Sequence, residues 1–117
     1  HATSHLRELG LVKGSGPNLQ AAVDGETYEV EEMYPAFHEV ATLQGEAGAQ
    51  RSFTYALEAE KIHAVLYEQA RAAVTGGKDA EVASLHVCEV CGHTVMGEPP
   101  ERCPVCNAPR TRYRAFQ

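Results

Sequence analysis

The sequence predicts a mainly helical protein that ends in a small metal-held module, and three observations lead to this fold class. Apolar residues recur every three or four positions over most of residues 1–80, as in amphipathic helices. Glycines and prolines are frequent after His86 and exclude long helices there. Two Cys-x-x-Cys pairs lie in that same stretch. We therefore predict a helical domain over 1–80 and a metal-binding domain of strands and loops over 81–117.

The helical domain is predicted to consist of helices separated by glycine-rich breaks. Gly10 and Gly45 end helical stretches, and Gly76 follows the last one. Pro35 falls inside an otherwise continuous helical pattern, where it should bend the helix or remove a backbone hydrogen bond. The predicted segments are, in order, a helix end at 1–9, a linker at 11–17, a helix from Pro17 or Asn18 to about Gln44, and a helix from Glu46 to about Val74.

Two charged pairs interrupt the apolar faces of the two long helices. The pairs are Glu26-x-x-Glu29 and Glu60-x-x-His63. Residues three apart on a helix project side by side, and an ionised carboxylate that faces a core is costly unless it is paired or bound to a cation. Each motif alone is typical of a solvated helix face. Because both lie on apolar stripes, we predict a metal site between the helices, with ligands that suit iron or manganese.

The cysteine pairs predict a second metal site. Cys88-x-x-Cys91 and Cys103-x-x-Cys106 are separated by eleven residues, and four thiolates make a tetrahedral site for zinc or iron. The spacing does not distinguish structural zinc from redox iron. Paired Cys-x-x-Cys motifs indicate a reducing compartment, which makes the cytoplasm the expected location. The nearby histidines are not needed as ligands, and we interpret them as surface residues or as residues that support the ligands. These histidines are His86 and His93.

Composition excludes several other classes of function. The net charge of -6 argues against nucleic acid as the main partner, because phosphate binding requires a basic surface. No apolar run approaches the roughly 20 residues of a membrane span, and no signal-peptide pattern opens the chain. Leu6 and Leu9 continue a helical spacing that starts before His1, so we expect a further segment upstream.

Taken together, the motifs resemble those of the rubrerythrin family. The resemblance extends from His1 to Phe116 and rests on the following segments: Asn18-Leu19-x-x-Ala22-x-x-Gly25-Glu26-x-Tyr28-Glu29, Met33-Tyr34-Pro35-x-Phe37, Glu60-x-x-His63-Ala64, Cys88-x-x-Cys91-Gly92 and Cys103-Pro104-x-Cys106. It implies a ferritin-like four-helix bundle with a non-haem di-iron site, followed by a rubredoxin-like domain with one iron on four cysteines. Zinc can replace iron in such a tetrathiolate site.

The resemblance also implies a role for each candidate ligand. The implied di-iron ligands are Glu26, Glu29, Glu60 and His63, and the implied ligands of the single iron are Cys88, Cys91, Cys103 and Cys106. His1 would be the histidine that binds one iron as it shifts on reduction, and Glu29 the ligand that this iron leaves. The family's first helix and the glutamate three residues before His1 are absent, so the bundle is partial and would be completed by upstream residues or by a partner chain.

The activity implied by the resemblance is the reduction of hydrogen peroxide to water in oxidative-stress defence. Electrons would be relayed through the Fe(Cys)4 centre from a rubredoxin or from an NAD(P)H-dependent reductase. A homodimer is expected, and the flexible segment Lys13–Gly16 would allow helices to be exchanged between subunits. Three alternatives stay open: a ferroxidase or iron-handling protein, an electron-transfer module without a working di-iron site, and a zinc-ribbon binding protein. A ferric tetrathiolate would be red, whereas zinc would be colourless.

Overall fold

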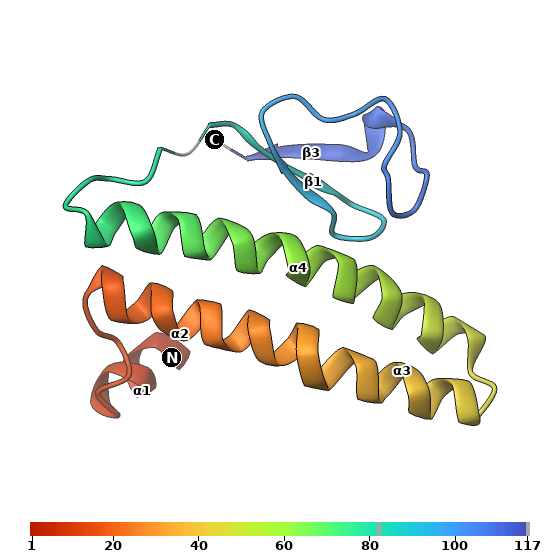
Figure 1. Cartoon of the computed structure of the whole chain (residues 1–117), viewed down its shortest axis with the longest axis horizontal. Coiled ribbons are helices and arrows are strands. Elements are labelled where there is room, and N and C mark those ends of the chain that lie inside the picture. The colour runs from red at the N-terminus through yellow and green to blue at the C-terminus, as the bar shows by residue number, and fades with distance from the viewer. Residues whose placement is uncertain (82, 117) are drawn as a thin grey trace.

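The computed structural model of the protein describes residues 1–81 and 83–116. A long helix, α4, lies between a helical layer and a small sheet, and the short α1 lies beside the start of α2 (Figure 1). The elements are α1 (Ala2–Glu8), α2 (Ser15–Tyr28), a π-helical segment (Glu29–Met33), α3 (Tyr34–Leu43), α4 (Ala47–Thr75), β1 (Leu85–Cys88), β2 (Thr94–Met96), a 3-10 turn (Arg110–Arg112) and β3 (Tyr113–Phe116).

The linker after α1 is shorter than the sequence predicts. Gly10 ends α1 in a left-handed conformation with φ of +66°, but α2 already begins at Ser15. Pro17 is therefore inside the first turn of α2, where the missing N–H would have had no helical partner. Asn18 ties the linker to the helix, because its side chain accepts from the backbone N–H of Lys13 at 2.9 Å and donates to the Lys13 carbonyl at 2.7 Å. The prediction of a linker over 11–17 was wrong for its last three residues.

The second predicted helix is continuous in direction but not in hydrogen-bond pattern. Between α2 and α3, five residues form a π-helical turn, and Pro35 follows in the first turn of α3. Proline has no N–H and clashes with the carbonyl four residues earlier, and a wider turn before it relieves both problems. The prediction of one bent helix is corrected accordingly: the irregularity precedes Pro35 and is a π turn.

The helices form a two-helix layer rather than a closed bundle. Gly45, with φ of +72°, reverses the chain between α3 and α4, which pack against each other through Phe53, Tyr34 and Phe37. Within the described helices, Ala41 and Ala59 alone are fully buried, whereas Leu43 is 86% exposed. This arrangement is half of a ferritin-like four-helix bundle. No helix in residues 1–81 and 83–116 is long and apolar enough to cross a membrane.

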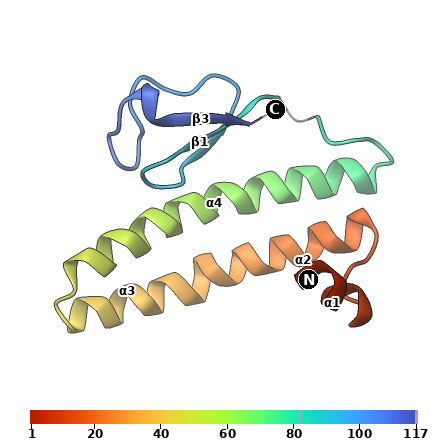
Figure 2. The same ribbon diagram turned by 180° about the vertical axis from the view of Figure 1, so that it is seen from behind.

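The C-terminal module is a three-stranded antiparallel sheet in the order β2-β1-β3. It lies against α4 on the side away from α2 and α3, as the rear view in Figure 2 also shows. Its hydrophobic core is a cluster of three buried thiols, Cys88, Cys91 and Cys103, and Tyr55 of α4 packs against them. The close approach of the module to α4 uses Gly92, where an added Cβ would lie 3.5 Å from that of Ala59.

Candidate metal centres

Two helices bring three candidate ligands together. Glu26 comes from α2, and Glu60 and His63 come from successive turns of α4, where the spacing of three places them side by side. One ligand atom from each of the three residues lies within 4.8 Å of the others. We call Glu26, Glu60 and His63 the helix cluster. All three side chains are half-buried.

The helix cluster concentrates negative charge. Burial, and next the charge of Glu60, raise the pKa of Glu26 from 4.5 to about 7. The Oε2 atom of Glu26 is buried without a hydrogen-bond partner among the described residues. A carboxylate oxygen in this situation is strongly favoured to bind a cation. The cluster therefore has the electrostatics of a cation site.

Glu29 and Tyr34 border the helix cluster. The pKa of Tyr34 is raised by burial, then by the charges of Glu29, Glu60 and Glu26, so the phenol faces the same acidic region. The charge of Glu29 also raises the pKa of Glu26, but Glu29 is not among the three residues whose ligand atoms converge. His1 lies exposed at the start of α1 and outside the helix cluster. The ligand roles of Glu29 and His1 stay predictions.

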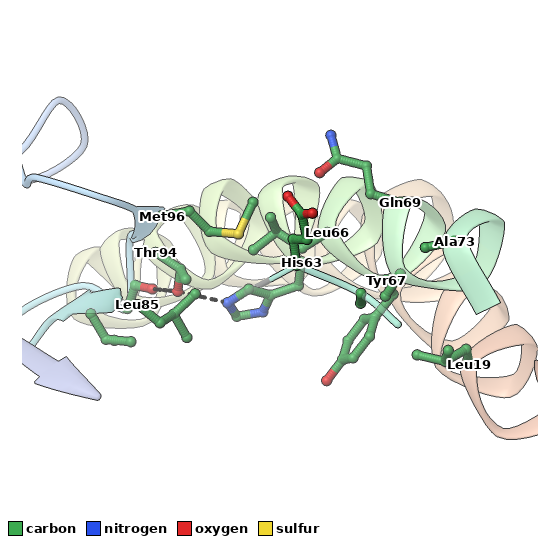
Figure 3. Close-up of a pocket in the computed structure, with 14 residues that line it drawn as sticks. Leu19, His63, Leu66, Tyr67, Gln69, Ala73, Leu85, Thr94 and Met96 are labelled. Atoms are coloured by element: carbon green, nitrogen blue, oxygen red, sulfur yellow. Dashed lines mark hydrogen bonds between the residues drawn. The ribbon is translucent and has the colours of Figure 1, made fainter. Parts of the chain in front are cut away.

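A hydrogen-bond network fixes the ring of His63. Its Nε2 lies 2.9 Å from the hydroxyl of Thr94, and this hydroxyl donates to the carbonyl of Gly92 at 3.0 Å (Figure 3). Because a carbonyl only accepts and Thr94 has a single hydroxyl proton, Nε2 of His63 is the donor to Thr94. The lone pair of a neutral His63 is then on Nδ1, which lies 2.6 Å from Oε2 of Glu60.

This network leaves acceptor atoms facing each other. Nδ1 of His63 and Oε2 of Glu60 both offer lone pairs, and the free Oε2 atom of Glu26 belongs to the same cluster. Such a set attracts a shared cation, either a proton or a metal ion. Two carboxylates and an imidazole are also the donor types of iron sites in helical bundles. The donor chemistry thus fits iron, with half of the ligand set of a di-iron bundle site present.

The four cysteines form the second candidate centre. Sulfur atoms of Cys88 and Cys106 are 3.6 Å apart, and those of Cys91 and Cys103 are 3.4 Å apart. A metal ion bound to four thiolates at about 2.3 Å requires sulfur–sulfur separations of about 3.8 Å. The spacing is therefore close to that of an occupied tetrahedral site. All four cysteines are free thiols.

Backbone N–H groups and a tyrosine favour thiolates at this centre. Burial raises the pKa of Cys103, but hydrogen bonds from the Tyr113 hydroxyl and from backbone N–H groups outweigh it and lower the pKa to about 6. Burial raises the pKa of Cys91. Tyr113 is also 2.8 Å from Nδ1 of His93, which supports the ligands indirectly. The turns close at Gly92 and Asn107, whose φ values are +82° and +60°.

A groove of about 620 Å³ runs between α4 and the sheet of the module. It is mainly apolar: α4 contributes Leu66 and Tyr67, the sheet contributes Leu85 and Met96, and the ring of His63 lies between these two groups (Figure 3). Beside the groove the module contacts α4 directly, through the hydrogen bond of Thr94 to His63 and through the packing of Tyr55 against the cysteines. The remaining predicted histidine, His86, lies on β1 and is half-buried.

Sequence reasoning did not identify Thr94. It lies in β2, three residues after Cys91, and its partner His63 is 31 positions earlier in the chain. No periodicity or motif marks such a contact, because it depends on how the module docks on α4.

A helical carboxylate–histidine cluster joined to a tetrathiolate module defines a class, that of non-haem iron proteins with a ferritin-like and a rubredoxin-like part. Comparison with known families agrees. Residues 12–71 match the rubrerythrin family, and residues 86–114 match the rubredoxin-like domain of rubrerythrin. The chain belongs to the rubrerythrin family. The cofactors of this family are a di-iron site and a rubredoxin-like Fe(Cys)4 centre, and both donor sets described above fit them.

Individual relatives support this membership over nearly the whole chain. Rubrerythrin-2 of Clostridium acetobutylicum is 43% identical over 130 residues, covering 99% of this chain and 71% of that protein. Nigerythrin of Nitratidesulfovibrio vulgaris is 36% identical over 99 residues, covering 85% of this chain and 48% of that protein. A solved structure of nigerythrin in a mixed-valence state matches with a TM-score of 0.78 at 34% identity. That match covers 89% of this chain and 50% of nigerythrin, so the chain spans about half the length of this relative.

Proposed function

We propose that the chain takes part in iron-dependent reduction of hydrogen peroxide to water, as an oxidative-stress function. The observation that carries the proposal is the direct contact between an oxygen- and nitrogen-donor cluster and a four-thiol module within one chain, at His63 and Thr94. Membership in the rubrerythrin family supports the same conclusion.

The proposed ligands divide between the two centres. Glu26, Glu29, Glu60 and His63 would hold the di-iron pair, with His1 as an additional histidine, and the four cysteines would hold the single iron. When bound, the iron pair supplies the two electrons for cleavage of the O–O bond, and the Fe(Cys)4 centre supplies electrons one at a time.

The protein side chains of the helix cluster have separate tasks in this proposal. The carboxylates of Glu26 and Glu60 balance the positive charge of the cofactor, which is why their mutual repulsion is tolerated. His63 provides Nδ1 as a neutral donor, since its Nε2 proton is engaged by Thr94. Burial and the nearby carboxylates raise the pKa of Tyr34, so its hydroxyl would keep its proton beside the cluster and serve as a hydrogen-bond donor there.

The arrangement also bears on the electron donor and on assembly. We propose a rubredoxin or an NAD(P)H-dependent reductase as the donor, docking on the exposed side of the module, where Cys106 is less buried than the other cysteines. A homodimer is proposed because a half bundle leaves apolar side chains such as Leu43 and Val40 exposed. The four free thiols suit the cytoplasm. The division of the chain into domains at 1–80 and 81–117 is part of the same proposal.

The test begins with iron content and the visible spectrum, followed by peroxide consumption without oxygen. Iron-reconstituted protein, reduced at the module, should be reoxidised by hydrogen peroxide with two module electrons per peroxide. Glu60→Gln should slow reoxidation at least tenfold, whereas the matched exposed control Glu39→Gln should behave as the wild type. Reoxidation by oxygen but not by peroxide would favour a ferroxidase. Equal rates for Glu60→Gln and wild type would refute the proposal.

A further inference from the structure

We propose that Thr94 is a positioning residue that fixes the ring of His63 with Nδ1 toward the carboxylates and thereby links the cysteine module to the helix cluster. The inference rests on the proposed role of His63 as a metal ligand, but it does not require peroxide to be the substrate. The juxtaposition that carries it is the hydrogen-bonded series from Gly92 through Thr94 to His63.

The directions of the hydrogen bonds make Thr94 an acceptor for His63. The Thr94 hydroxyl can donate only once, and its proton goes to the Gly92 carbonyl at 3.0 Å. It must then accept from Nε2 of His63 at 2.9 Å. A metal-binding histidine usually donates its other ring N–H to a fixed acceptor, which sets the tautomer and the orientation of the ring. Thr94 supplies that acceptor from a different structural unit.

Burial makes both hydrogen bonds of the Thr94 hydroxyl necessary. Thr94 is 4% exposed, and it is the one buried residue with a polar side chain within residues 1–81 and 83–116. Loss of either partner would leave a buried polar group unsatisfied and would lower the stability of the protein. The native structure is therefore expected to keep both hydrogen bonds of the hydroxyl. His63 itself remains half-buried and has no other partner for Nε2 among the described residues. Without Thr94 its ring would be free to flip, which would place the carbon Cδ2 where Nδ1 now faces Glu60.

Thr94 lies close in the chain to one of the candidate cysteine ligands. Gly92, whose carbonyl accepts the hydroxyl proton, directly follows the candidate ligand Cys91. It lies so close to α4 that an added Cβ would be in contact with the Cβ of Ala59 at 3.5 Å. The turn that holds one sulfur ligand is therefore also the turn that holds His63. Formation of the tetrathiolate site should order Thr94, so the helix cluster would be completed only when the module is folded.

The test compares Thr94→Val with Thr94→Ser in the full chain. Valine keeps the shape and removes both hydrogen bonds, whereas serine keeps the hydroxyl. With zinc alone as the probe, one ion fills the cysteines, and further zinc titrates the helix cluster. We expect Thr94→Val to weaken this second binding about 10- to 100-fold and Thr94→Ser to stay within about threefold of wild type, as for other residues that orient metal-binding histidines.

A spectroscopic measurement separates orientation from packing. In zinc-loaded protein labelled with 15N-histidine, the His63 ring, assigned by its loss in His63→Gln, should carry its proton on Nε2. Thr94→Val should lose this single form, and a cobalt tetrathiolate spectrum should show that the module is intact in both variants. A proton on Nδ1 in the wild type, or equal losses in Thr94→Ser and Thr94→Val, would overturn the inference. Correct ring geometry without peroxide turnover would instead keep this inference and remove the proposed function.

Discussion

Replacement of Glu26 by glutamine should stabilise the protein at alkaline pH while the helix cluster is free of metal. Burial and the charge of Glu60 raise the pKa of Glu26 from 4.5 to about 7, so the ionised carboxylate opposes folding above neutral pH. Glutamine has nearly the same shape and no charge. The same change removes a proposed ligand, so stability and metal binding should respond in opposite directions.

The magnitude follows from the two pKa values. Between pH 4.5 and about 7 the folded carboxyl keeps its proton and the unfolded one loses it. This group's contribution to stability is therefore fully present below pH 4.5 and is lost as the pH rises through about 7. The full difference corresponds to an upper limit of about 3.5 kcal/mol at about 1.4 kcal/mol per pH unit. Since Glu26 is only half-buried, we expect about 1–2 kcal/mol after solvent screening.

The assay is urea unfolding followed by the helical circular dichroism signal at pH 5 and pH 8. One equivalent of zinc keeps the cysteine module folded, and Glu39→Gln on the exposed side of α3 serves as the control. Glu26→Gln should gain stability relative to wild type at pH 8 but much less at pH 5, and Glu39→Gln should gain at neither. A Glu26→Gln variant that is no more stable than wild type at pH 8 would show that the carboxylate is not strained by its surroundings.

Three further outcomes are expected. Cys103→Ser should abolish the cobalt tetrathiolate absorption and make the module sensitive to trypsin, because cysteines form its buried core; the helical signal should persist. Phe53→Ala should lower the free energy of unfolding by about 2 kcal/mol in urea, because its ring contacts Tyr34 and Phe37, and Phe53→Leu should lose less than half as much. Gly92→Ala should lower the free energy of unfolding of the zinc-loaded module by about 1 kcal/mol, measured by thermal unfolding, because φ at this position is +82°.

The sequence predicted the elements that are governed by local rules. The last helix was expected from Glu46 to about Val74 and spans Ala47–Thr75, because its periodicity is unbroken and Gly76 follows it. The mainly helical class and the small cysteine module were confirmed. The start of α2 was misplaced by two or three residues, since a proline within a first helical turn looks the same in sequence as one in a linker.

For the candidate site too, the sequence could predict what helix periodicity determines but not what depends on tertiary packing. Convergence of Glu26, Glu60 and His63 could be predicted because helix periodicity places all three on facing stripes. The contact of His63 with Thr94 could not, because it depends on where a separate module docks. The π turn was also beyond a periodicity argument, since a widened turn and a simple proline bend leave similar patterns. The roles of Glu29 and His1 stay predictions that the geometry of this chain does not test.

The π turn at Glu29–Met33 has a consequence for how this helix tolerates insertions and deletions. A π turn accommodates one residue more than the α turn that it replaces, and one residue corresponds to a rotation of roughly 100° about the helix axis. Deleting a residue there would restore regular hydrogen bonding and yet turn α3 relative to α2. Tyr34 and Phe37 would then leave Phe53 while Glu26 stayed in place. The π turn therefore determines which face of α3 meets Phe53 on α4.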